Sequence, residues 1–473
     1  MTGPFVFNGF DPWQWLEIVE HELLLFAAVF FLIGALDELA VDLAWLRLKL
    51  TGRTRPLRFG SAPDAPLRGI AAVLVPAWRE AEVVAAMLRH CRASWPQHEL
   101  RIYAGCYRND AETLAALIEG AAADLRIRVV VHAADGPTTK ADCLNRLYAA
   151  LAADERRSGV RARSVILHDA EDMVHPEALA LIDRTLDDAD FVQIPVIPVP
   201  QPRSRWIAGH YGDEFAEAHG KTMVVRDWLA AGLPAAGVGC GFARDILETL
   251  ARKRDGASPF ATECLTEDYE LGLLIAEAGG RQRFVRAVAP DGGLIATREL
   301  FPTDLGVAVR QKTRWLHGIA FQGWDRLGWH GRFSERWMRL RDRRGPLTAL
   351  VLAAAYLLIV IWAVLFMATR AGWHDPAPLS RALVALLWIN FASFVWRAGF
   401  RFGFTAQAYG WVEGLRAIPR IPFANVIAIM AGRRATAAYL RSLRGGAVRW
   451  EKTPHPVHAT ALIALRPAGR ALA

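Results

Sequence analysis

Long apolar segments on both sides of a charged middle region constrain the fold of this chain most. Residues 23–36 read LLLFAAVFFLIGAL, and an extension in either direction makes this segment long enough to cross a bilayer. Residues 346–369 and 379–396 are two further apolar spans around a short connector, which predicts a helical hairpin. Hydrophobic residues make up 53% of the 473 positions, a high fraction for a soluble protein. We therefore expect membrane helices around one sizeable domain.

Basic residues indicate which ends of these segments face the cytoplasm. The formal net charge is +8, and arginines crowd into residues 47–58, 332–344 and 397–401, beside the apolar spans. By the positive-inside rule, residue 47 onward and both flanks of the hairpin lie inside. This pattern predicts membrane lipid as a partner and argues against nucleic acid, for which no recognition motif is present. The five cysteines form no CxxC pair, which indicates a reducing compartment.

The chain divides into four expected regions. An N-terminal transmembrane segment covers residues 1–46, a cytoplasmic domain covers 65–340, and the transmembrane hairpin covers 346–397. Within the C-terminal region, 398–473, a short apolar run near residues 418–430 is interrupted by prolines. This run predicts an interfacial or re-entrant helix rather than a full crossing.

Within the cytoplasmic domain, strand and helix patterns alternate. Apolar strand patterns occur at residues 70–75, 100–105, 127–132, 164–168 and 191–197, with helical patterns at 80–89 and 111–123. Alternation of this kind predicts an α/β fold with a parallel sheet and helices on both faces. In such sheets ligands bind at the carboxyl ends of the strands. Polar clusters follow three of the strands, at 76–80, 108–110 and 169–172, so we expect a binding site there.

The acidic string Asp169-Ala170-Glu171-Asp172 follows one of these strands. Carboxylates one residue apart on a turn can both reach a hard cation, which in turn holds a diphosphate. Oxygen ligands indicate Mg²⁺ or Mn²⁺, and the lack of His/Cys ligand spacing argues against zinc. The alternative is an acidic helix N-cap without a metal.

A second acidic string, Thr266-Glu267-Asp268, precedes a predicted helix at residues 269–278. Asp268 is a candidate general base that takes a proton from an attacking hydroxyl. The alternative is a helix-capping arrangement with no chemical role.

Gln311, Arg314 and Trp315 have the spacing i, i+3 and i+4, so they share one face of a helix. Arg314 with Gln311 beside it is suited to a leaving diphosphate, and Trp315 to stacking on a sugar. The alternative is an amphipathic interface helix with a tryptophan anchor.

Two weaker signals lie elsewhere in the domain. Lys140 and Asn145 could contact a nucleotide phosphate or base, although a lysine at a helix start is an equally good explanation of Lys140. The run GVGCG at residues 237–241 is too rich in glycine for a packed element and predicts close approach of the backbone to a ligand.

Taken together, the motifs resemble those of inverting, processive-type family 2 glycosyltransferases with the GT-A fold, the group of the cellulose, chitin and hyaluronan synthases. The resemblance extends over about residues 10 to 456. It is carried by VPAWRE at 75–80, NDAET at 109–113, KADCLN at 140–145, HDAED at 168–172, TED at 266–268, QKTRW at 311–315 and WEKTPH at 450–455.

The resemblance implies a GT-A domain inserted between transmembrane helices of the bacterial inner membrane. It implies transfer of a hexosyl or N-acetylhexosaminyl group from a UDP-sugar to a growing polysaccharide or another acceptor, with Asp268 as the catalytic base. Asp110 would hold the uracil or ribose of the donor. The implied donor-binding residues are Pro76, Glu80, Asp110, Lys140 and Asp169; the metal ligands are Asp169 and Glu171; and the acceptor- or diphosphate-binding residues are Glu267, Gln311, Arg314 and Trp315.

Several points stay open at the level of sequence. Glu171 stands where the family has a second aspartate, so either Glu171 or Asp172 meets the metal. Three spans are few for a polymer channel, so export would need a partner or a homo-oligomer. Some relatives carry a C-terminal domain that senses cyclic di-GMP, which this sequence does not contain. The alternative functions are a non-catalytic membrane receptor or scaffold, and transfer of a single sugar to a lipid phosphate.

Overall fold

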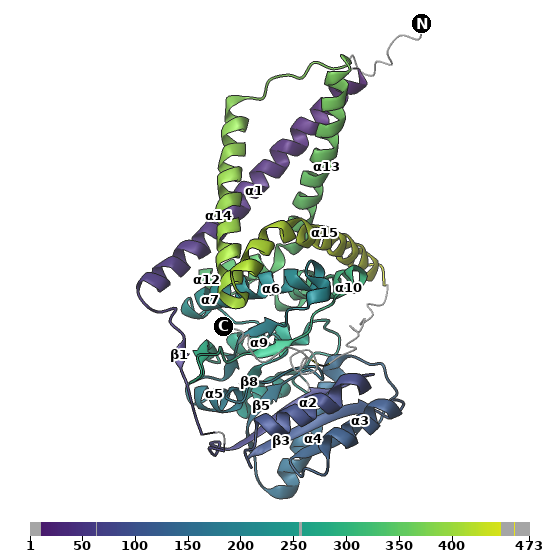
Figure 1. The fold of residues 1–473 in the computed structure, drawn as a ribbon. Helices are drawn as coiled ribbons and strands as arrows, with labels where there is room; N and C mark the ends of the chain where they lie inside the picture. Colours follow the sequence, from purple (N-terminus) through teal and green to yellow (C-terminus); the bar gives the residue numbers. More distant parts are fainter. Residues whose placement is uncertain (1–10, 63, 255–257, 446–457, 459–473) are drawn as a thin grey trace.

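Three long helices stand over a mixed α/β domain, and a fourth lies across their lower ends (Figure 1). The computed structural model describes residues 11–62, 64–254, 258–445 and 458. The upright helices are α1 (Pro12–Leu50), α13 (Gly345–Arg370) and α14 (Arg381–Tyr409), and the helix across their ends is α15 (Trp411–Ser442). Among the described residues, these four helices are long and apolar enough to cross a membrane.

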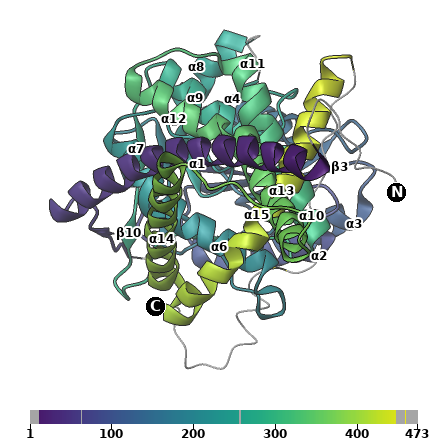
Figure 2. The same cartoon turned by 90° about the horizontal axis from the view of Figure 1, so that it is seen from above.

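Helix α1 is longer than its apolar core at residues 23–36. Asp11 caps its start by accepting hydrogen bonds from the backbone of Trp13 and Gln14, and the side chain of Gln14 bonds back to Asp11. This reciprocal cap satisfies backbone groups that would otherwise lack partners. The helix packs against both α13 and α14, so the two helices of the expected hairpin pack mainly against α1 rather than against each other (Figures 1 and 2).

The expectation of a short helix near residues 418–430 is wrong in length. Helix α15 continues for 32 residues with Pro419 and Pro422 inside it. Proline removes one helical hydrogen bond, but packing against α6 (Ile207–Glu217), α10 (Leu305–Leu316), α13 and α14 holds the helix together. Figures 1 and 2 show α15 lying across the upright helices; an interfacial position stays a prediction.

A seven-stranded sheet forms the centre of the mixed domain, and the predicted α/β class is confirmed. Its strands in spatial order are β4 (Ile127–His132), β3 (Leu100–Tyr107), β2 (Ile70–Pro76), β5 (Ala162–Leu167), β8 (Cys240–Ala243), β6 (Phe191–Gln193) and β9 (Gln282–Phe284). The sheet is not wholly parallel, since β8 runs antiparallel to both β5 and β6.

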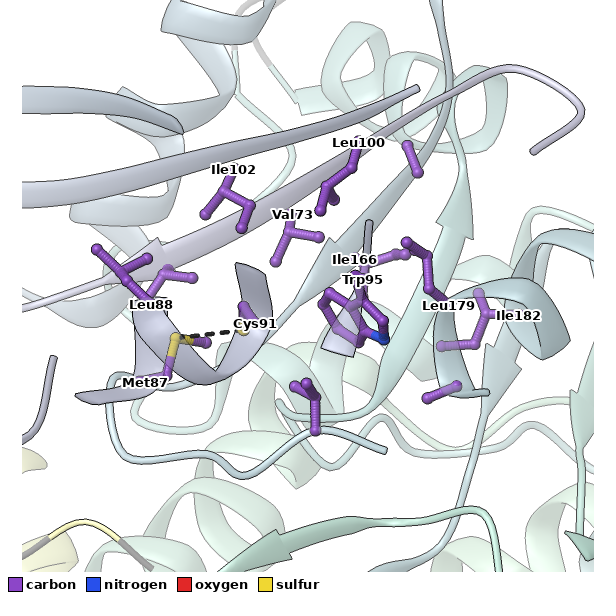
Figure 3. Packing of buried hydrophobic residues seen from close by; sticks show 14 of the residues in the cluster. Val73, Met87, Leu88, Cys91, Trp95, Leu100, Ile102, Ile166, Leu179 and Ile182 are labelled. Atoms are coloured by element: carbon purple, nitrogen blue, oxygen red, sulfur yellow. Dashed lines mark hydrogen bonds between the residues drawn. The ribbon is translucent and has the colours of Figure 1, made fainter. Parts of the chain in front are cut away.

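Helices cover both faces of the sheet, because alternate residues of β2 face opposite sides. Val73 and Val75 belong to one apolar core, and Ala72 and Leu74 to the other. Figure 3 shows the first core, where Trp95 packs beside the sheet and donates a hydrogen bond to the His175 carbonyl. The helices of the first face are α2 (Ala81–Ser94), α3 (Ala111–Ala121) and α5 (Ala178–Thr185); those of the second are α4 (Lys140–Ser158), α8 (Arg244–Arg254) and α9 (Glu267–Glu277).

The strand expected at residues 191–197 is divided. Its first part is β6 in the main sheet, and its second part, β7 (Val196–Pro198), pairs with β11 (Thr297–Glu299) instead. Pro195 lies between them and has no amide hydrogen to donate to a ladder.

A further small pair joins β1 (Leu57–Arg58) to β10 (Ala287–Val288). The other helical segments are η1 (Pro202–Ser204), η2 (Ala218–Thr222), α7 (Met223–Trp228), η3 (His317–Gln322), α11 (Gly323–Leu327) and α12 (Phe333–Arg343).

Buried charges attach α1 to the mixed domain. The Nζ atom of Lys221, in η2, lies 2.5 Å from Oδ1 of Asp42 in α1 and 2.7 Å from Oε1 of Glu217 in α6. Glu38, one turn before Asp42, accepts a hydrogen bond of 2.8 Å from Arg397 of α14. Lys221 and Asp42 have no exposed side-chain surface, so each depends on the other for neutralisation.

We expect Lys221→Met to destabilise the protein by about 3–5 kcal/mol, because it removes the nearest cation of the fully buried Asp42. The measurement is thermal unfolding of the detergent-purified chain. The control is Lys253→Met, since Lys253 is an exposed lysine at the end of α8. Equal unfolding temperatures for the two variants would contradict the role assigned to Lys221.

Candidate active site

A pocket lies at the carboxyl ends of β2, β3 and β5, the edge at which the sequence predicts binding. Its walls come from the loops after these strands, from the start of α4 and from helix α10. The structure brings most of the predicted residues together here: Pro76, Glu80, Lys140, Asp169, Glu171, Asp268, Gln311, Arg314 and Trp315. Asp110 and Glu267 do not line the pocket.

The carboxylates of the acidic turn after β5 lie in two different environments. Asp169 and Glu171 line the pocket. Asp172 is fully buried, and its Oδ2 atom accepts hydrogen bonds from Nδ1 of His168 (2.6 Å) and from the Asp169 amide (3.1 Å). Burial lowers the pKa of His168 to about 4, so its ring is neutral at pH 7. Asp172 therefore fixes the turn, and Glu171 rather than Asp172 lines the pocket.

Lys140 begins α4 and points into the same pocket. Its Nζ atom lies 2.5 Å from Oδ1 of Asp169. Burial alone would lower the pKa of Lys140, but the carboxylates of Asp169, Glu267 and Asp268 outweigh burial and raise it. The lysine therefore stays charged and offsets part of the negative charge of this acidic wall. Asn145, which the sequence grouped with Lys140, instead exchanges two hydrogen bonds with the backbone of Phe260 and is structural.

Asp268 lies in the first turn of α9 and lines the pocket, while its neighbour Glu267 is buried behind it. Burial raises the pKa of both carboxyl groups, and the Asp268 charge adds to the effect on Glu267. Thr266 occupies the cap position but makes no side-chain cap hydrogen bond, so the capping alternative finds no support. A carboxyl with a raised pKa in a pocket has the properties of a general base.

The glycine-rich run at residues 237–241 has a different role from the one expected. Its second half is strand β8 in the centre of the sheet, so the run does form a packed element. At Gly237 (φ +79°) an added Cβ would lie 2.4 Å from Oδ2 of Asp268 and 3.3 Å from Nζ of Lys140. The backbone thus approaches the protein's own catalytic candidates closely, and glycine is required to leave them room.

Helix α10 presents the predicted face to the pocket. Asp304 caps its start by accepting a hydrogen bond from the Val307 amide. The amide oxygen of Gln311 is buried and has no hydrogen-bond partner among the described residues. The Trp315 ring is held edge-on by Phe301, with ring centres 6.4 Å apart. The other side of α10 packs against α15, so the helix is both a pocket wall and an interface element.

Asp110 supports the pocket from outside. Its carboxylate caps α3 through the Thr113 amide and accepts a hydrogen bond of 2.6 Å from the Arg79 amide. Arg79 has φ +53°, a strained value for a residue with a side chain. Asp110 therefore helps to hold the loop that carries Trp78 and Glu80 in place.

Sequence reasoning missed several aromatic and acidic lining residues. Tyr107 ends β3 and meets the Trp78 ring edge-on at 5.1 Å, which gives the pocket an aromatic wall. The position of Tyr107 just after the strand predicted at residues 100–105 could have identified it from the sequence, because ligands bind at the carboxyl ends of such strands. Glu299 and Phe301 enter the pocket from β11 and the segment after it. Their placement follows from the pairing of β11 with β7, which no local pattern indicates.

The tail string at residues 450–455 lies outside the described residues. Beyond it, Nε2 of the buried His458 lies 3.0 Å from the Asp172 carbonyl oxygen. His458 therefore contacts the acidic turn.

The pocket offers two carboxylate ligands to a hard divalent cation. Within the described parts of the chain, no cluster of three or more His, Cys, Asp or Glu side chains could hold a metal alone. Asp169 and Glu171 supply two carboxylates, and Mg²⁺ is commonly held by one or two carboxylates with substrate phosphates as further ligands. The residues present fit a cation that binds together with a phosphorylated ligand.

Residues 68–318 match the family described as "Glycosyltransferase like family 2", and the chain belongs to that family. The match covers the whole main sheet, the pocket and helix α10.

Two curated relatives are similar over most of the chain. They are "Bacteriophage adsorption protein B" of Escherichia coli strain K12 and "Bacteriophage N4 adsorption protein B" of Escherichia coli O157:H7. Each is 34% identical over 478 aligned residues, which cover 94% of this chain and 63% of the relative. The chain thus spans less than two thirds of their length.

Solved structures show more distant likenesses. The mannosyltransferase PcManGT from Pyrobaculum calidifontis, in complex with GDP-Man and Mn²⁺, is 19% identical with a TM-score of 0.47 and covers 85% of this chain and 99% of its own. The glucosyl-3-phosphoglycerate synthase from Mycobacterium tuberculosis, with Mn²⁺, UDP and phosphoglyceric acid, is 16% identical with a TM-score of 0.32 and covers 53% of this chain and 78% of its own. The family assignment rests on the match over residues 68–318.

We expect Gly237→Ala to abolish glycosyl transfer, because the new methyl group displaces the Asp268 carboxylate and Lys140. Gly159→Ala is the matched control, since Gly159 also has a positive φ (+69°) but no atom within 4 Å of an added Cβ. Both variants should lose about 1–2 kcal/mol of stability from backbone strain. Activity and thermal unfolding are measured side by side. Full activity in Gly237→Ala would contradict the crowding argument.

The raised pKa of Asp268 predicts an acid limit of activity above the ordinary aspartate value of 3.8. A base acts only when deprotonated, so kcat/KM should fall as pH drops through the raised pKa. Lys140 lowers the pKa of Asp268, so Lys140→Met should move this limit to higher pH as well as reducing the rate. A pH–rate profile tests both expectations; a limit that moves to lower pH in the variant would refute the assignment.

Proposed function

We propose that this protein is an inverting, membrane-associated glycosyltransferase that uses a UDP-sugar donor and Asp268 as its base. One observation carries the proposal: a single pocket combines the Asp169 and Glu171 carboxylates, the base candidate Asp268, and the Gln311–Trp315 face of α10. Each feature alone has an ordinary structural explanation, but their meeting at the carboxyl edge of the sheet is what the transfer reaction needs.

The proposed reaction is one displacement at the anomeric carbon. Asp268 takes the proton of an acceptor hydroxyl, whose oxygen forms a bond to C1 of the sugar. The bond from C1 to the β-phosphate oxygen breaks, and UDP leaves with that electron pair. Because attack and departure occur on opposite faces, the configuration at C1 inverts. Arg314 stabilises the charge that develops on the leaving diphosphate.

We assign the donor end of the pocket from the chemical character of the residues that line it. Trp78 and Tyr107 offer an aromatic surface for the nucleobase, and Lys140 offers a cation to the diphosphate. Asp110, Pro76 and Glu80 shape the neighbouring loop. A Mg²⁺ or Mn²⁺ ion held by Asp169 and Glu171 would neutralise phosphate charge when bound.

We assign the acceptor to the side of the pocket nearer the membrane helices. Gln311 and Trp315 lie on α10, which packs against α15, and α15 lies across the lower ends of the upright helices (Figure 1). The arginine distribution supports a cytoplasmic position of this domain at the inner membrane. The acceptor is then a saccharide at the membrane surface. Polymer export through three upright helices would need a partner or a second copy.

The test is nucleoside diphosphate release by detergent-purified protein across a panel of UDP-sugars and GDP-mannose, with Mg²⁺, Mn²⁺ or EDTA. We expect metal-dependent release from one UDP-sugar, reduced at least about 10³-fold in Asp268→Asn. The mutant should remain folded and gain stability above the raised pKa of Asp268, because the wild-type carboxylate ionises there against its burial.

Glu263→Gln serves as the control, since Glu263 is an exposed carboxylate on the segment before α9. Release that persists in Asp268→Asn at the wild-type rate would refute the assigned base. Release from GDP-mannose alone would refute the UDP-sugar assignment. No release from any donor, with saccharide acceptors supplied, would count against an enzyme and for a scaffold.

A further inference from the structure

A second cavity lies where α1 ends, away from the active site. It has a volume of about 490 Å³ and shares no lining residue with the active-site pocket. Its walls are the last turn of α1, the turn that follows it, helix α7, and the chain from β9 to β10. Figures 1 and 2 both show the end of α1 close to α7 and to the β1–β10 pair.

Four arginines line this cavity: Arg53, Arg55, Arg283 and Arg286. Only two carboxylates, Asp188 and Asp227, accompany them, which leaves an excess of two positive charges. Asp227 is already engaged, since it accepts a hydrogen bond of 2.9 Å from the Phe284 amide and lies 3.5 Å from Nε of Arg283.

The other arginines lack acidic partners. Within the described residues, no ion pair is formed by Arg53, Arg55 or Arg286. Arg286 is largely enclosed, and its Nη1 atom donates a hydrogen bond of 2.7 Å to the His219 carbonyl. A carbonyl does not neutralise a guanidinium, and burial lowers the pKa of Arg286. Converging cations without counter-charges are a common feature of anion sites.

The remaining surface of the cavity is apolar. Leu48, Val224, Phe284 and Val285 line it together with Trp228. Trp228 also faces Arg47 of α1, with 5.9 Å between the guanidinium carbon and the ring centre. A ligand that suits both surfaces has an anionic group and an apolar or neutral part.

We propose that this cavity binds a phosphate ester, with Arg53, Arg55 and Arg286 as the phosphate-binding residues. Guanidinium groups match phosphate oxygens in geometry, and the excess of two positive charges suits a phosphate ester. Two sources share this chemistry, namely the headgroup of an anionic phospholipid and a soluble phosphate. The site is independent of the proposed function, because no residue is common to both pockets. A bound phosphate would join the end of α1 to α7 and β10 through shared contacts.

The test uses the full chain in detergent and three probes: dioctanoyl-phosphatidylglycerol, dioctanoyl-phosphatidylcholine and inorganic phosphate. Thermal unfolding is followed while each probe is titrated. We expect phosphatidylglycerol, or phosphatidylglycerol and phosphate together, to raise the unfolding temperature, and phosphatidylcholine to have no comparable effect. Stabilisation by phosphatidylglycerol alone identifies a lipid headgroup as the source, and stabilisation by both identifies the phosphate itself.

The variant Arg53→Gln/Arg55→Gln should weaken binding about 100-fold, at about tenfold for each charged hydrogen-bonding group removed. Both arginines are exposed, so the variant should fold. Arg58→Gln is the matched control, because Arg58 is an exposed arginine three residues further on that does not line the cavity. Equal weakening in the control, equal stabilisation by phosphatidylcholine, or no stabilisation by any probe would overturn the proposal.

Discussion

The orientation of the catalytic domain against its membrane helices depends on a set of buried opposite charges. Apolar contacts are non-directional, so they alone allow long helices to slide or rotate at little cost. Asp42 and Lys221 restrict that freedom, because a shift of α1 by one turn would separate the fully buried Asp42 from its nearest cation. Glu38 adds contacts to Arg341 and Arg397, which belong to α12 and α14. Charges from one membrane helix therefore fix several elements of the domain at once.

That fixed orientation reaches the active site through α15 and α10. Tyr211, Phe301, Val309 and Ile427 form an apolar cluster between these helices and α6, and Trp315 packs at its edge. The wall that carries the Gln311–Trp315 face is therefore built on a helix that packs against the long apolar helix α15. In contrast, the acidic turn is built on the sheet, where Asp172 holds it. The pocket forms only where these two supports meet.

The sequence predicted the parts of this structure that depend on local pattern. The strands at residues 70–75 and 127–132 follow from apolar runs, and the face of α10 follows from helical spacing. Strand β8 was missed because glycines there allow Ile182 to pack against the backbone, a contact made by a distant segment. The prolines of α15 led to a wrong prediction of a short helix for a similar reason, because packing partners far along the chain stabilise that helix. The positions of Asp110 and Glu267 behind the pocket likewise depend on tertiary packing, which local sequence patterns do not reveal.

Lys140 gives the pocket its own counter-ion. Because its ammonium group lies against Asp169, that carboxylate is already paired before any ligand enters. A divalent cation alone would have to compete with this ammonium for Asp169, whereas a diphosphate offers the ammonium a second anion. Metal and nucleotide would then favour each other's binding, a coupling that needs no movement of the backbone. Under the proposed function, the lysine would make the pocket favour the pair over either component.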